Sequence, residues 1–177
     1  EGNNNVAIGI NSLTSNTTAS DNTSVGYCAL VSNTTGHSNV AVGANSLLVN
    51  TTARDNVALG FCALVGNTTG CRNTASGSLA LDSNTTADNN TATGYKALYL
   101  NTTGTGNVGI GCGALSANTT GGSNVAIGLE AMKENTTASS NIGIGSSALT
   151  CNTTGASSVA IGQSSLFKNS TGSSHTA

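Results

Sequence analysis

Short apolar runs alternate with polar turns along the whole chain, and the pattern returns every 17 residues, as from Asn33 to Asn50. Each run has the form of "NVAIG" at 124–128, in which two β-branched residues flank a small one. An alternation with a period of two is typical of a strand. A glycine inside every run would weaken a helix by about 1 kcal/mol each time. The pattern therefore predicts an all-β protein.

One 17-residue repeat predicts one coil of a parallel β-solenoid. We expect the β-branched residues of each run and the apolar residue that follows the run to face inward. These are Val6, Ile8 and Leu13 in the first repeat and Val125, Ile127 and Met132 in the eighth. A second short strand is expected around that apolar residue, and Asn-Thr-Thr-Gly is expected to turn the chain back. Ten such coils make residues 1–177 a single β-roll-like solenoid, interpreted as a window of a longer fibre.

Each run ends in a glycine, which we place at a bend because glycine adopts positive φ and allows close approach of another backbone. These bend glycines are Gly9, Gly26, Gly43, Gly60, Gly77, Gly94, Gly111, Gly128, Gly145 and Gly162.

The composition supports stacking. Only 7% of the residues are charged, against about 25% in a typical domain. In a stack, a charge repeated at one place in every coil would form a repelling column. After Glu1, every charged residue avoids the strand run, the core leucine and the Asn-Thr-Thr triplet. Proline is absent, as expected where every backbone N–H bonds to a neighbouring coil.

The Asn-Thr-Thr triplet is an acceptor sequence for N-linked glycan. Because the triplet lies in an expected turn every time, we expect its asparagines to project outward in a column and to carry covalent glycans. The alternative is structural, since stacked Asn and Thr side chains can hydrogen-bond along a solenoid without sugar. The expected sites are Asn16, Asn33, Asn50, Asn67, Asn84, Asn101, Asn118, Asn135, Asn152 and Asn169, the last in Asn-Ser-Thr.

Two other asparagines begin the same acceptor sequence. Asn22 precedes a strand, where the equivalent asparagines of other repeats are expected to form an inward ladder, so we do not count it. Asn89 is kept as an additional candidate for glycosylation.

No group of residues points to catalysis, a cofactor or a metal, so no enzyme is expected. The five cysteines lack metal-ligand spacing, and His37 and His175 lie far apart in sequence. Cys28 and Cys62 are two coils apart, about 9.6 Å at the coil rise, which exceeds the reach of a disulfide. A net charge of −2 offers no basic face for nucleic acid. No apolar run approaches the roughly 20 residues that span a bilayer.

At "NVAIG" (124–128) and "SVAIG" (158–162) the sequence resembles the head repeats of trimeric autotransporter adhesins. The resemblance implies a left-handed parallel β-roll, packed as three chains, that binds host surfaces. The full unit, as in "NTATGYKALYLNTTGTG" (90–106), is also similar to repeats of phage-tail-fibre-like proteins and secreted repetitive proteins of aquatic microbes. No catalytic residue carries over.

These observations predict a structural subunit of an extracellular or cell-surface filament or stalk, glycan-coated and assembled with copies of itself. A solenoid can be extended by adding coils, since each coil contacts only its neighbours. The first alternative is an adhesin-type solenoid that binds surfaces. Ice binding is a further alternative, but it favours threonines two apart on a strand. The triplet threonines are adjacent, as Thr17 and Thr18 are, so only one column is expected to face outward.

Overall fold

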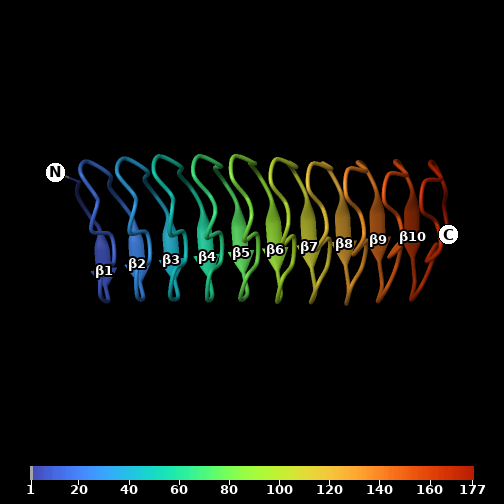
Figure 1. The fold of residues 1–177 in the computed structure, drawn as a ribbon, viewed down its shortest axis with the longest axis horizontal. Helices are drawn as coiled ribbons and strands as arrows, with labels where there is room; N and C mark the ends of the chain where they lie inside the picture. Colours follow the sequence, from blue (N-terminus) through green and yellow to red (C-terminus); the bar gives the residue numbers. More distant parts are fainter. Residues whose placement is uncertain (1) are drawn as a thin grey trace.

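The fold, seen in a computed structural model that describes residues 2–177, is a parallel β-solenoid with one strand per 17-residue repeat. Ten strands form one sheet in chain order, and Figure 1 shows them side by side along the long axis, all pointing the same way. The predicted fold class is confirmed. The strands are β1 (Val6–Ile8), β2 (Thr23–Val25), β3 (Val40–Val42), β4 (Val57–Leu59), β5 (Thr74–Ser76), β6 (Thr91–Thr93), β7 (Val108–Ile110), β8 (Val125–Ile127), β9 (Ile142–Ile144) and β10 (Val159–Ile161).

Equivalent residues of successive repeats lie in register. Val40 pairs with Val57, for example, and Val57 pairs with Thr74. Backbone hydrogen bonds between coils also continue beyond the sheet: the N–H of Leu98 donates to the carbonyl of Ala114 over 2.9 Å. Each coil is therefore held to its neighbours on several sides of its circumference.

The bend glycines confirm the prediction made for them. Their φ angles lie between 121° and 145°, a region that side-chain-bearing residues rarely adopt. A Cβ added at Gly128 would lie 2.6 Å from the carbonyl oxygen of Gly145 in the next coil. Glycine is thus required there both by the backbone conformation and by the close approach of the next coil.

The segment after each bend glycine was expected to form a second strand, and this expectation is wrong. It consists of two consecutive turns. In the sixth repeat the N–H of Ala97 donates to the carbonyl of Gly94 over 3.3 Å, and that of Asn101 to Leu98 over 3.1 Å. Lys96 has a φ of 54°, the left-handed conformation that the third residue of a type II turn requires. A left-handed residue interrupts the extended backbone that a strand needs.

The core leucine of each repeat faces inward, as predicted. Leu115 and Met132 are fully buried, and Leu13 is 8% exposed. These residues also adopt left-handed φ, such as 53° at Leu115. That conformation costs a non-glycine residue about 1–2 kcal/mol, whereas burying a leucine gains about 1.5–3 kcal/mol. Leucine is kept at this strained position because the free energy gained by burying its side chain matches or exceeds the free-energy cost of the left-handed backbone.

The inward direction predicted for the β-branched strand residues is wrong. Val6 and Ile8 are 45% and 60% exposed, and Ile127 is 36% exposed, whereas the middle residue Ala126 is fully buried. Successive side chains of a strand point to opposite faces, so only one of the two sets can face inward. The space between the sheet and the core leucines admits only a small residue: a Cβ added at the middle residue Gly143 would lie 2.8 Å from Met132 Cγ.

Candidate functional site: two asparagine ladders and an exposed apolar face

The asparagine that precedes each strand, here called the strand asparagine, belongs to a ladder inside the solenoid. Asn39 is fully buried. Its Nδ2 donates to Asn22 Oδ1 over 3.1 Å and to the Ala53 carbonyl over 2.9 Å. Its Oδ1 accepts from the backbone N–H of Asn56 over 3.1 Å. The inward ladder predicted around Asn22 is confirmed. Its members are Asn5, Asn22, Asn39, Asn56, Asn73, Asn90, Asn107, Asn124 and Asn141, with Ser158 after them.

The triplet asparagines form a second ladder. Asn84 is fully buried, and its Nδ2 donates to Asn67 Oδ1 over 2.8 Å and to the Ala87 carbonyl over 3.1 Å. Its Oδ1 accepts from Asn101 Nδ2 over 3.1 Å. The side-chain bonds run without a break from Asn33 to Asn169. The bond to the carbonyl three residues on closes the Asn-Thr-Thr-Gly or Asn-Thr-Thr-Ala bend.

One carbonyl joins the two ladders in each coil. The Ala87 carbonyl accepts from Asn84 Nδ2 over 3.1 Å and from Asn73 Nδ2 over 2.8 Å. The strand asparagine and the triplet asparagine of one coil are therefore fixed to the same backbone group. Burying an amide costs free energy unless the amide is hydrogen-bonded. In both ladders the asparagine of one coil is the hydrogen-bond partner of the asparagine in the next coil.

The outward projection of the triplet asparagines was predicted and is wrong. From Asn33 to Asn152 every triplet asparagine is fully buried. N-linked glycan would replace a hydrogen on Nδ2, and in Asn84 both hydrogens of that nitrogen are in hydrogen bonds. Glycosylation itself stays a prediction that this geometry opposes in the folded chain. The residues concerned are Asn16, Asn33, Asn50, Asn67, Asn84, Asn101, Asn118, Asn135, Asn152 and Asn169.

The two remaining acceptor sequences differ in exposure. Asn22 is fully buried in the strand ladder. Asn89 is exposed, and its Oδ1 accepts from Arg72 Nε over 2.8 Å. Asn89 is thus the acceptor whose side chain the fold leaves accessible.

The outward residues of the ten strands form a continuous surface, here called the apolar face. It consists of the first and third residue of each strand, and most are Val, Ile or Leu. Leu59, Ile110 and Ile127 are 40%, 38% and 36% exposed. Each of these side chains is covered along the stack by its equivalents in the two adjacent coils, so the remaining exposure belongs to the outer tip.

The middle of the apolar face carries hydroxyl groups. The outward residues of β5 and β6 are Thr74, Ser76, Thr91 and Thr93. No charged residue belongs to the face.

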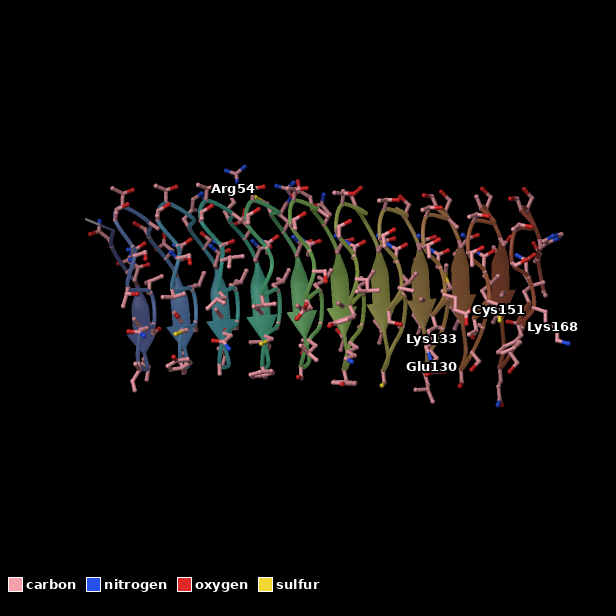
Figure 2. All side chains as sticks on the ribbon, viewed as in Figure 1. Arg54, Glu130, Lys133, Cys151 and Lys168 are labelled. Atoms are coloured by element: carbon pink, nitrogen blue, oxygen red, sulfur yellow. The ribbon has the colours of Figure 1, made fainter. Side chains whose placement is uncertain are left out.

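The charged residues lie at the edges of the coils. Arg72 and Asp88 pair over 2.9 Å, and Lys133 and Glu130 over 2.8 Å. Figure 2 shows Arg54 projecting from one edge and Glu130 and Lys133 from the opposite edge. Lys96 Nζ lies 5.3 Å from the Tyr95 ring and 5.1 Å from the Tyr99 ring.

The cysteines are free thiols: Cys28, Cys62, Cys71, Cys112 and Cys151. Partial burial raises the pKa of the Cys62 thiol, which lowers its thiolate fraction. Among residues 2–177 no group of three or more His, Cys, Asp or Glu could hold a metal ion. The described coils also contain no pocket. From Gly2 onward, no helix has the length and hydrophobicity to cross a bilayer.

Comparison with known proteins identifies no relative: no family model, curated protein or solved structure matches the chain. The likeness to adhesin-head repeats is therefore one of short motifs. The class that the structure itself establishes is a 17-residue-repeat β-solenoid with asparagine ladders.

Proposed function

We propose that the chain is a structural rod, a segment of an extracellular or cell-surface filament or stalk that assembles with copies of itself. The observation that carries the proposal is the unbroken register of the stack. Nine consecutive strand pairs repeat the same alignment, and both asparagine ladders follow the same axis.

A rod with this interior resists local opening. Removing one coil from its neighbours would break backbone bonds of the strand, such as Val108 N–H to Asn124 carbonyl at 2.8 Å. It would also break the side-chain bonds of both ladders, since each amide depends on the coils beside it. Bending or fraying the rod therefore costs hydrogen bonds at every coil that opens, and this resistance suits a spacer or fibre segment.

The chain spans little distance for its length, and this too fits a load-bearing element more than a long linker. Each repeat of 17 residues advances the rod by about 4.8 Å. An extended chain would advance about 3.3 Å per residue. The 17 residues of a repeat therefore build a thick, internally hydrogen-bonded coil and add little to the length of the rod.

The proposal is tested in two measurements. Small-angle X-ray scattering should give a rod, and duplication of residues 107–123 should lengthen it by about 4.8 Å without changing its cross-section. Immunogold electron microscopy of cells that make the protein should place the label along filaments or stalks outside the cell. A compact scattering shape, or a diffuse intracellular label, would refute the proposal. Surface binding of the adhesin type and ice binding stay alternative predictions.

A further inference from the structure

We infer that the apolar face is the surface through which two copies of this chain pack side by side, with their axes parallel and their repeats in register. The inference rests on the proposed rod function and names the partner of its exposed sheet. The sheet has one face inside the solenoid and one outside, and the outside face carries the larger side chains of each strand.

The chemistry of the face favours an apolar partner. All 20 outward positions of the ten three-residue strands hold Val, Ile, Leu, Thr or Ser, and none holds a charged residue. Charged residues gather at the coil edges, where Arg72, Asp88, Glu130 and Lys133 lie. A surface that stays uncharged over ten strands is depleted of the residues that keep an exposed sheet in water.

The size of the face matches a stable interface. Ten strands at about 4.8 Å each give a length of about 48 Å, and two outward side chains across give a width of about 12 Å. The face therefore covers roughly 600 Å², at the upper limit of the apolar patches found on monomers. Two copies would bury about 1,200 Å² in total, where specific interfaces begin.

A second copy in register suits the hydroxyl groups better than an unrelated apolar surface. Thr74, Ser76, Thr91 and Thr93 interrupt the apolar face at β5 and β6. Burying a hydroxyl without a hydrogen-bond partner is costly. In a parallel, in-register pair a two-fold axis runs along the rods, so the first residue of each strand faces the third residue of the equivalent strand. Thr74 then meets Ser76 and Thr91 meets Thr93, and since a hydroxyl both donates and accepts, the two of each pair can bond to each other. In seven of the other eight repeats the facing residues are valine, isoleucine or leucine, and in β2 Thr23 meets Val25.

The test compares two variants with the same added charge. Ile110→Lys with Ile127→Lys places two ammonium groups on the apolar face, at side chains whose tips are already exposed. Thr120→Lys with Thr137→Lys places them in the same two coils at exposed threonines of the triplet bend. Far-UV circular dichroism and thermal melting check that both variants keep the solenoid.

Sedimentation velocity across the micromolar range then measures association. The unmodified chain and the threonine variant should associate alike, and the isoleucine variant should bind its copy at least tenfold more weakly. An unmodified chain that stays monomeric, or two variants that lose association equally, would overturn the inference. Small-angle X-ray scattering of the monomeric variant tests the rod proposal separately. A rod-shaped particle together with a lack of association would refute only the interface.

Register is tested by oxidation of single cysteines in a variant whose five native cysteines are replaced by serine. Val125→Cys should form a disulfide with Ile127→Cys of a second copy when the two variants are mixed, because parallel, in-register packing brings these two positions together. Thr137→Cys, on another side of the same coil, should not. A disulfide at Thr137→Cys alone, or none between Val125→Cys and Ile127→Cys while association persists, would overturn the parallel arrangement.

Discussion

Replacing Asn84 by alanine tests whether the triplet ladder stabilises the solenoid. The substitution removes the donor to Asn67 Oδ1, at 2.8 Å, and the acceptor for Asn101 Nδ2, at 3.1 Å. The Ala87 carbonyl keeps its bond from Asn73. Two buried polar groups are therefore left without a partner, namely the Asn67 oxygen and one hydrogen of Asn101.

Each unsatisfied buried group costs about 1–3 kcal/mol, so Asn84→Ala should lower the free energy of unfolding by about 2–6 kcal/mol. That is a large part of the roughly 5–15 kcal/mol that stabilises a typical domain. Thr86→Ala is the matched control in the same bend, because Thr86 is exposed. The control should change stability by less than about 0.5 kcal/mol.

Urea unfolding followed by circular dichroism measures the difference between these two variants. Hydrogen exchange adds local information, since repeat arrays do not always unfold in one step. Faster exchange should be centred on the coils of Asn67, Asn84 and Asn101. A water molecule could fill the space vacated by the amide and satisfy both groups. A cost within about 0.5 kcal/mol of the control would therefore refute the reasoning that Asn84→Ala leaves these two buried groups without a partner.

The same position gives a prediction about pH. Asn84→Asp keeps the shape but loses the amide hydrogens, and burial should raise the pKa of the new carboxyl above its unfolded value of about 3.9. A raised acid pKa means that the folded state holds its proton more tightly than the unfolded state. The variant should therefore be most stable below the unfolded pKa and lose stability as pH rises. Equal destabilisation relative to the parent chain at acidic and neutral pH would contradict this.

Three further predictions concern the glycines and the acceptor sequences. Gly128→Ala should destabilise more than Gly162→Ala, because both have positive φ but only the Gly128 Cβ meets the next coil; equal melting temperatures would show that the close approach is unimportant. Gly143→Ala should cost about 1 kcal/mol by overpacking against Met132, and the cost should fall when Met132→Leu is added, as a double-mutant cycle of urea unfolding would measure. Expression through a glycosylating secretory route should yield chains that either lack glycan on the triplet asparagines or fail to fold, because Nδ2 is buried; folded protein with glycan at most of these sites by mass spectrometry would disprove the ladder.

Local sequence rules correctly predicted the parts that depend on the backbone and on the repeat. The 17-residue interval, the alternation in Val125–Ile127 and the glycine at Gly128 predicted a stacked all-β coil with a bend. The absence of charged residues from the strand runs agreed with a stack in which equivalent residues of successive repeats lie above one another. These features could be inferred because each depends on a residue and its equivalents one repeat away.

The direction of the side chains could be decided only by the folded coil. A strand such as Val-Ala-Ile offers two faces, and the usual preference for burying the larger apolar side chains selects the wrong one here. The core leucines and the two asparagine ladders already fill the interior, so the sheet fits only with Ala126 inward and Ile127 outward. The sequence did contain a sign of this, since the middle strand residue is Ala, Ser or Gly in every repeat.

The same limit applies to the triplet asparagines. From sequence, Asn84 in an Asn-Thr-Thr turn suits an exposed acceptor and a buried ladder equally well. The Ala87 carbonyl lies in the same bend as Asn84, but the amides of Asn67 and Asn101 become partners only when the turns of adjacent coils stack. The sequence by itself determined the repeat, the strands and the bends. Tertiary structure decided which groups are buried, because burial depends on what the opposite wall of the coil leaves room for.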